Sequence, residues 1–313
     1  MDLVVIGHLL KEKIIFADGR EIGPVLGSPA AYASVASAKL GLKTGLVTKI
    51  GEDMPEELLE VFKKTGVDID GMRVGKNSTA NLLIYKDSEE KRLKFLKKAD
   101  NISFNDIPKE YLDTEFFLIA PIDYEVEESL IWFLYTKGKR LSMELSGFGG
   151  ASSSKNGKNK KEKIDFLKKI TKYFEIVKGG KEDCSCIFGK FDKKDIAKKF
   201  LEWGAKISII TLGVEGALVA TKSDCFQIPC FPAKVKDITG AGDVWHAGFL
   251  YRYIKAGQSA KGVGQNVVKK SAIFASATAS LVIEKSEGVK KERFPEAKQV
   301  YERIKTGGKD GRN

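Results

Sequence analysis

The 313-residue sequence has little histidine, little cysteine and no long hydrophobic run. It contains two histidines, and the spacings of its cysteines, C-x-C and C-x4-C, do not match a zinc site. We therefore expect free thiols in a reducing compartment. The four cysteines are Cys184, Cys186, Cys225 and Cys230.

Two kinds of membrane signal are also missing from the sequence. No stretch reaches the roughly 18 continuous apolar residues of a membrane span. The opening segment "MDLVVIGHLLKEK" (1–13) carries Asp2 where a signal peptide has a basic region. We expect this segment to be a buried first strand, and the protein to be cytoplasmic.

Acidic residues are fewer than basic ones, 42 against 53, which gives a formal net charge of +11. Such an excess can serve nucleic acid, an anionic membrane surface or an anionic substrate. Here the lysines are spread along the chain and interleaved with glutamates. We therefore expect neither a nucleic-acid nor a membrane partner, and a small molecule as the ligand.

Segments with strand character alternate with segments of helical period along most of the chain. Strands are expected at 3–7, 44–51, 115–121, 140–145, 175–180 and 206–213. Helices are expected at 28–41, 52–66, 123–138, 163–174, 193–204, 243–257 and 264–283. This alternation predicts an α/β fold with a doubly wound, mostly parallel sheet flanked by helices on both faces.

Two segments near the front break the alternation. Residues 12–26 and 79–97 each have β-like flanks around a polar turn, which predicts two hairpins. Paired with each other, they would form a small β-sheet lid over a domain that spans 1–304. The segment 151–163 is rich in Ser, Asn, Gly and Lys and predicts a mobile surface loop, and 305–313 predicts a disordered tail.

A turn of small residues followed by a carboxylate stands out in "DITGAGDVWHAGF" (237–249). It follows an extended segment, so we expect a strand-to-helix turn at 239–243. Convergent amides at the positive end of a helix form an anion site. Asp243 is then either an N-cap or a general base for an attacking hydroxyl. An anion site beside a base suits phosphoryl transfer. The amides would be those of Gly240, Ala241 and Gly242.

Two neighbouring residues have an ordinary explanation. His246 lies one helical turn after Asp243, and a lone histidine on an apolar helix usually packs rather than reacts. Trp245 is expected in the core for the same reason. A Walker loop of the form G-x-x-x-x-G-K-[ST] is absent, which argues against a P-loop kinase.

Four motifs in order resemble those of the ribokinase-like, or PfkB, family of carbohydrate and nucleoside kinases. "DITGAGD" (237–243) is similar to the second signature of that family, and "LGSPAAYASVASAKLGLKTGLVTKIGED" (26–53) to its first. "TLGVEGALV" (211–219) resembles its nucleotide segment, and "FASATASLVIEKSEG" (274–288) its C-terminal helix and loop. The resemblance covers residues 1–300 and implies the ribokinase-like fold.

The resemblance also implies roles for individual residues. Asp243 would be the catalytic base, and the 240–242 amides would hold the transferred phosphoryl group. The family uses ATP with Mg²⁺, and many members hold a monovalent cation such as K⁺ near Asp237 and the 283–288 loop. The resemblance also suggests a homodimer through the lid, although monomers occur in the family too. The implied ATP-site residues are Thr211, Gly213, Gly216, Asp183 and Ser276, and the implied metal residues are Asp237 and Asp183.

The sequence departs from the family pattern on the substrate side. Glu12 replaces an aspartate that usually holds substrate hydroxyls. Gly27 and Ser28 replace a pair of glycines. Tyr32 replaces a frequent asparagine, and it would either stack on a sugar ring or lie in the core.

A second departure concerns the metal and the phosphates. The Asn-x-x-Glu element of the family aligns with "GKED", so Gly180 replaces the asparagine and Asp183 the glutamate. This change places metal positioning in question. Glu144 stands where many members carry an aspartate after a strand, and its role is open.

We therefore expect ATP-dependent phosphorylation of a hydroxyl group on a small sugar or cyclic polyol, with Asp243 as base. The predicted substrate-binding residues are Glu12, Gly27, Ser28 and Tyr32. One alternative is a nucleoside kinase of the same family, with Tyr32, Phe16 or Tyr85 stacking on the base. The other is a non-catalytic sugar- or nucleotide-binding relative, because the Asn-x-x-Glu element is altered.

Overall fold

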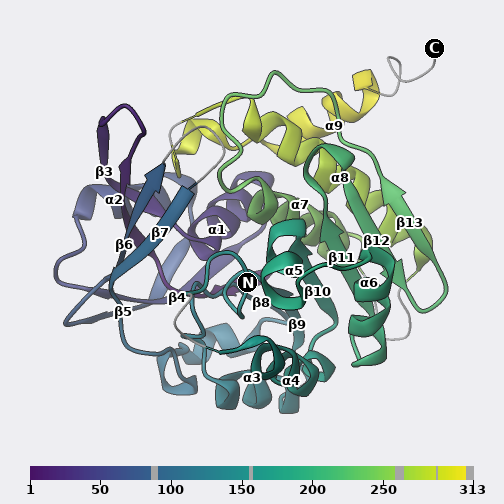
Figure 1. The fold of residues 1–313 in the computed structure, drawn as a ribbon, viewed down its shortest axis with the longest axis horizontal. Coiled ribbons are helices and arrows are strands. Elements are labelled where there is room, and N and C mark those ends of the chain that lie inside the picture. Colours follow the sequence, from purple (N-terminus) through teal and green to yellow (C-terminus); the bar gives the residue numbers. More distant parts are fainter. Residues whose placement is uncertain (86–90, 155–157, 258–263, 287, 308–313) are drawn as a thin grey trace.

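The structure is a computed structural model, and it describes residues 1–85, 91–154, 158–257, 264–286 and 288–307 (Figure 1). Within these ranges no helix is both long enough and apolar enough to cross a membrane. The chain forms one large sheet, helices on both of its faces, and a second smaller sheet.

The large sheet has nine strands among the described residues, in the order β13-β12-β11-β10-β9-β8-β1-β4-β5. They are β1 (Leu3–Ile6), β4 (Thr44–Gly51), β5 (Asp68–Gly75), β8 (Phe116–Ile119), β9 (Arg140–Glu144), β10 (Ile176–Gly180), β11 (Ile207–Thr211), β12 (Ala217–Thr221) and β13 (Cys225–Ile228). The strands from β11 to β5 are parallel, whereas β12 pairs antiparallel with both β11 and β13. The predicted doubly wound, mostly parallel sheet is confirmed.

Helices cover both faces of this sheet because its central strands are apolar on both sides. In β1, Leu3 and Val5 face one cluster while Val4 and Ile6 face the other, and all four are fully buried. Each such side chain contributes about 1.5–3 kcal/mol through burial. The first face carries α1 (Pro29–Leu40), α2 (Glu56–Thr65), α7 (Ala241–Lys255) and α8 (Gln265–Ile283). The second carries α3 (Glu128–Thr136), α4 (Lys160–Ile170), α5 (Lys181–Phe188) and α6 (Lys193–Glu202).

The second sheet is the predicted lid. Its order is β3-β2-β6-β7, and β2 pairs with β6 in parallel, so the two hairpins join along their first strands. It lies to one side of the large sheet (Figure 1, purple and blue). The last residue of β3 leads directly into α1, which connects the lid to the main domain. The strands are β2 (Leu10–Ile15), β3 (Glu21–Gly27), β6 (Thr79–Tyr85) and β7 (Lys91–Lys97).

Several predicted boundaries differ from the structure. The predicted loop at 151–163 ends earlier, because α4 begins at Lys160, where the Asn159 side chain accepts the Glu162 amide at 3.0 Å. The remainder of that loop includes 155–157, which lie outside the described residues. The predicted tail begins too early, since α9 (Ala297–Gly307) packs on α8. Residues 308–313 lie outside the described ranges.

The sequence analysis also missed whole elements. Helix α5 was missed because "KEDCSCIF" has polar residues on most of its surface and is short. Strand β5 was missed because charged residues interrupt it at the sheet edge. Strand β12 and helix α9 were not predicted either, and β13 forms only the first part of the segment that was expected to be extended. Strands β5 and β13 form the two edges of the sheet, and Val300 is the one buried residue among those described in α9, so burial imposes a weaker hydrophobic pattern on these elements.

Two glycines shape the turn between β11 and β12. Gly213 has φ 62° and Gly216 has φ 87°, in the left-handed region that favours glycine. A Cβ atom on Gly216 would lie 1.9 Å from the Ile228 carbonyl oxygen, whereas one on Gly213 would meet nothing within 4 Å. A side chain would strain the backbone at both positions, but only at Gly216 would it also collide with a neighbouring strand.

We expect Gly216→Ala to destabilise the fold by about 3 kcal/mol or more, because it adds a collision with β13 to the cost of the positive φ. Gly213→Ala is the matched control and should cost about 1 kcal/mol. Urea unfolding of both variants measures the difference. Equal unfolding midpoints would contradict the close approach described for Gly216.

Candidate active site

The predicted anion site lies at the start of α7. Strand β13 ends at Ile228, and residues 229–240 have no regular structure, so the expected strand-to-helix turn is instead a loop that leads into the helix. Gly240 closes this loop with φ 74°. A Cβ atom there would lie 2.3 Å from the Tyr32 ring, so the position needs glycine for both its angle and its space.

The three predicted amides are not equivalent. The Ala241 N–H donates to the Ile238 carbonyl at 3.1 Å. The amides of Gly240 and Gly242 have no backbone acceptor among the described residues. The N-cap of α7 is Gly240, and Asp243 makes no capping hydrogen bond. Of the two roles that the sequence left open for Asp243, N-cap or general base, the structure therefore does not support the N-cap. The helix thus presents free donors beside a carboxylate that does not cap it.

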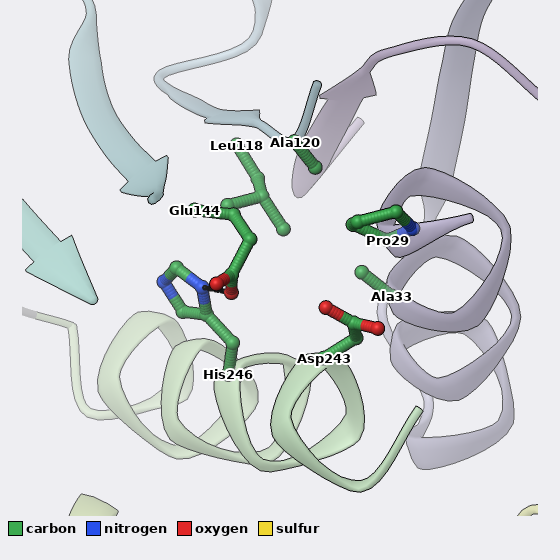
Figure 2. Close-up of a pocket in the computed structure, with 7 residues that line it drawn as sticks. All are labelled: Pro29, Ala33, Leu118, Ala120, Glu144, Asp243 and His246. Carbon is green, nitrogen blue, oxygen red and sulfur yellow. Dashed lines mark hydrogen bonds and ion pairs between the residues drawn. The ribbon is translucent and has the colours of Figure 1, made fainter. Parts of the chain in front are cut away.

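The Asp243 carboxyl group faces an enclosed space between α7, β9 and α1 (Figure 2). Glu144 points into the same space from the end of β9, and Pro29 and Ala33 of α1 close it on the opposite side. The space has no room for a water molecule. Asp243, which is partly exposed, therefore lies next to a second carboxyl group.

One ammonium group, that of Lys178, lies close to Glu144 and Asp243. Lys178, in β10, is 2% exposed, and its Nζ lies 3.0 Å from both carboxylate oxygens of Glu144. A Cβ atom on Gly242 would be 2.9 Å from the same Nζ, so the ammonium lies directly against the first turn of α7. The site thus combines a fixed cation with the positive end of a helix.

Burial and mutual repulsion change the protonation of these groups. Burial, with the charges of Glu144 and Asp183, raises the pKa of Asp243 to about 8 against the opposing effect of Lys178. Burial likewise raises the pKa of Glu144 to about 7, although Lys178 lowers it in part. Burial alone would lower the pKa of Lys178, but Glu144, Asp243 and Asp183 outweigh it and raise that pKa.

His246 and Trp245 pack in the core, as predicted. His246 is fully buried, and its ring nitrogens lie 2.7 Å from the Ser142 hydroxyl and 3.1 Å from Glu144 Oε2. Burial, with the charge of Lys178, lowers the pKa of His246 well below its usual value, so the ring is neutral. An ionised Glu144 can only accept, so Nδ1 donates to it and Nε2 accepts from Ser142.

Asp183 has a structural role at the start of α5. Its Oδ2 accepts the Gly180 N–H at 2.7 Å, and its Oδ1 accepts the Ala151 N–H at 2.9 Å. No group of three or more His, Cys, Asp or Glu residues that could hold a metal occurs in the described part of the chain. Asp183 is also buried, at 6% exposed, so both of its oxygens are engaged by backbone amides.

The predicted nucleotide residues lie near one another at the ends of β10 and β11. Thr211 pairs with Gly180 in the sheet, and the residue after it, Leu212, lines an open pocket of about 370 Å³ with Lys181 and Lys193. Ser276 is separate, because its hydroxyl donates to the Pro229 carbonyl at 2.8 Å.

The predicted substrate residues lie where the lid meets α1. Ser28 caps α1 by accepting the Ala31 N–H at 3.0 Å, and it does so at φ 113°, a strained value for a residue other than glycine. Gly27 ends β3 next to Glu12, since a Cβ there would lie 3.8 Å from Glu12 Oε2. Tyr32 is 4% exposed and belongs to the core, so it is not available to stack on a ligand.

Three residues that the sequence analysis did not single out belong to this region. Asn81 lies opposite Glu12 across β2 and β6, and its Oδ1 is buried without a hydrogen-bond partner among the described residues. Lys178 could have been found from the sequence, because a lysine inside an apolar strand needs a buried partner. Arg293, which pairs with Asp237 at 3.2 Å, had no such signal.

The comparisons with known proteins concern the family and the fold of the chain. The model of the pfkB family carbohydrate kinases matches residues 148–292. A cytidine kinase of Thermococcus kodakarensis is 35% identical over 260 residues, which cover 81% of this chain and 88% of the relative.

Solved structures with the same fold are more distant in sequence. Aminoimidazole riboside kinase from Salmonella enterica superposes with a TM-score of 0.78 at 20% identity. The superposition covers 97% of this chain and 100% of the kinase chain. A pyrophosphate-dependent kinase in the ribokinase family superposes with a TM-score of 0.77 at 22% identity, covering 93% and 98%. At these identities the likeness establishes the fold.

We expect Lys178→Met to destabilise the protein by about 3–5 kcal/mol, because it leaves the Glu144 carboxylate buried without its cation. The double variant Lys178→Met with Glu144→Gln should recover most of this loss and keep an acceptor for His246. Lys161→Met, which breaks an exposed pair with Asp165, is the control and should cost less than about 1 kcal/mol. Urea unfolding measures all three, and a double variant no more stable than the single one would contradict the pairing.

We expect Asp243→Asn to stabilise the protein increasingly as the pH rises. The pKa of Asp243 is raised in the folded state, so the unfolded state loses its proton first, and the aspartate lowers stability between about pH 4 and pH 8. The gain from asparagine should be near zero at about pH 4 and should grow by up to about 1.4 kcal/mol for each pH unit towards about pH 8. Thermal unfolding across this range tests the trend, and a gain that is independent of pH would refute the raised pKa.

Proposed function

The chain belongs to the PfkB family of carbohydrate kinases, and on that premise we propose that it transfers a phosphoryl group to a hydroxyl of a small sugar, cyclic polyol or nucleoside. The observation that supports this most directly is the pairing of the Asp243 carboxyl group, which makes no capping bond, with the unpartnered amides of Gly240 and Gly242. A base and an anion site at one helix end are the two parts that this reaction requires.

In the proposed mechanism, Asp243 accepts the proton of the substrate hydroxyl, whose oxygen attacks the terminal phosphorus of the donor. The amides at the start of α7 stabilise the charge that develops on the transferred group. Lys178 lies beneath the same turn and adds a fixed positive charge. Mg²⁺, when bound with the donor, offsets the charge of the phosphates, and Asp183 is the residue we assign to hold it through water.

The lid is proposed to supply the acceptor side of the site. Glu12 and Asn81 lie side by side on β2 and β6, so a carboxylate and an amide face the same ligand. Such a pair suits vicinal hydroxyls, one of which would donate to the carboxylate and the other to the amide oxygen of Asn81, which is unpartnered among the described residues. Closure of the lid would exclude water and so limit hydrolysis of the donor.

The acceptor class rests on this polar pair and on the relatives. Free sugars and cyclic polyols remain our first expectation from Glu12 and Ser28. Nucleosides have specific support, since the relative with 35% identity is a cytidine kinase. The core position of Tyr32 leaves Phe16 of the lid as a candidate for stacking on a base, although Arg20 already lies 4.9 Å from its ring centre. Both classes carry the vicinal diol that the lid pair would bind.

The phosphoryl donor is proposed to be ATP. The turn at Gly213 and Gly216 and the adjoining pocket support a nucleotide, and one structural relative was solved with ATP and Mg²⁺. Another is described as pyrophosphate-dependent. Both donors therefore belong in the assay. We also propose a homodimer through the lid, whose edge strands β3 and β7 have one paired side each among the described residues.

Phosphorylation is tested with purified protein, Mg²⁺ and either ATP or pyrophosphate, across sugars, inositols, sugar phosphates and nucleosides that include cytidine. We expect one acceptor class to be phosphorylated, with kcat/KM rising as the pH increases towards about 8, because Asp243 must lose its proton to act as base. Asp243→Asn should lower kcat by about 10²–10⁴-fold without loss of stability.

Asp165→Asn, on the exposed face of α4, is the control and should keep full activity. Near wild-type turnover by Asp243→Asn would overturn the base assignment. Binding of ATP and sugar without product from any acceptor would instead select the non-catalytic relative.

A further inference from the structure

A buried arginine contacts the loop that leads to the anion site, although it belongs to a later segment of the chain. Arg293 ends the short helix η5 (Lys291–Arg293) and is 1% exposed, which makes it the largest fully buried side chain of the described residues. A buried charge requires compensation, so the groups around it are informative. They come from two segments that are far apart in the sequence.

Oxygen atoms lie around both terminal nitrogens of the guanidinium group, whereas its Nε is buried without a hydrogen-bond partner among the described residues. Its Nη2 donates to the carbonyl oxygens of Asp237 at 3.0 Å and Thr239 at 2.9 Å, and it lies 3.2 Å from the Asp237 carboxylate. Its Nη1 donates to the Gly288 carbonyl at 3.2 Å. Three carbonyls and one carboxylate thus converge on one positive charge.

This is the kind of donor set that would otherwise bind a small monovalent cation, because carbonyl and carboxylate oxygens are hard ligands. The resemblance implied a cation such as K⁺ near Asp237 and the 283–288 loop. The residues present do not fit a free ion there, since the guanidinium already occupies the carbonyls of Asp237, Thr239 and Gly288.

The position of this charge connects it to the anion site. Thr239 precedes Gly240, and Gly240 is the residue whose αL conformation begins α7. Arg293 also donates to the Tyr32 hydroxyl at 3.4 Å, and the Tyr32 ring packs against Gly240. The arginine and the tyrosine, which contact each other, therefore both pack against the segment that begins α7.

We propose that the Arg293 guanidinium is a built-in cation that replaces a bound monovalent ion, so that this protein positions its anion site without K⁺. Arg293 is a positioning residue, because it acts through the 237–240 loop and touches no reacting atom. The catalytic readout rests on the proposed function, whereas the response of stability to cations does not.

The first experiment compares wild-type protein in K⁺, Na⁺ and tetramethylammonium buffers of equal ionic strength. We expect kcat to change by less than about twofold and Tm to stay constant, because no site is left for an added ion to stabilise. A rise in Tm, or at least a tenfold activation, that is specific to K⁺ would overturn the proposal. The Tm measurement is informative even if no acceptor is ever found.

The second experiment uses Arg293→Ala, which opens the oxygen-lined space. We expect kcat to fall by about 100-fold through misplacement of the loop. Added guanidinium or K⁺ should restore a large part of the activity and raise the Tm of this variant. Arg293→Lys keeps a charge and should lose less activity.

Arg303→Ala is the matched control. Arg303 also pairs with a carboxylate, Glu284, and donates to a carbonyl, that of Pro232, but it is partly exposed and lies away from the 237–240 loop. It should show no rescue by either cation. If Arg293→Ala folds and neither guanidinium nor K⁺ changes its Tm or activity, the built-in cation is refuted. If it does not fold, Arg293→Lys and the wild-type comparison decide.

Discussion

The ammonium of Lys178 is the charge on which the arrangement of the site depends. It is buried at the centre of the molecule and bonded to both oxygens of Glu144, while the carboxyl groups of Asp183 and Asp243 also lie within its field. One cation cannot neutralise three acids, so the excess negative charge is relieved by protonation. This shortage of positive charge, together with burial, raises the pKa of Asp243 to a value suited to a base that works near neutral pH.

A second buried cation lies on the other side of the same helix start. Arg293 donates to the Thr239 carbonyl just before Gly240, and Lys178 Nζ lies close to Gly242, so both cations border the segment that carries the free amides. Preorganised charge of this kind does not need to reorient when a negative group arrives. The same rigidity carries a cost in stability, because dehydrated acids beside Asp243 disfavour the folded state as the pH rises.

Sequence reasoning worked best where a periodic pattern and burial agree. Strand β4 was predicted residue for residue, and α1 ends at the Gly41 that was expected to stop it. It failed for Tyr32, where a ligand contact and a core position were both open, and packing against Gly240 decided for the core. It also could not show that both carboxylate oxygens of Asp183 accept backbone N–H groups, because one of the donors, Ala151, lies far from Asp183 in the sequence.

The sequence by itself determined the α/β fold, the lid hairpins and the family, because these follow from local hydrophobic periodicity and from motifs that occur in order. It also located Asp243 beside small residues at a helix start. Only the tertiary structure decided which charges surround that aspartate. Lys178, Glu144 and Arg293 reach the site from separate strands and turns, and the pKa of a buried acid is set by neighbours in space rather than by neighbours in the chain.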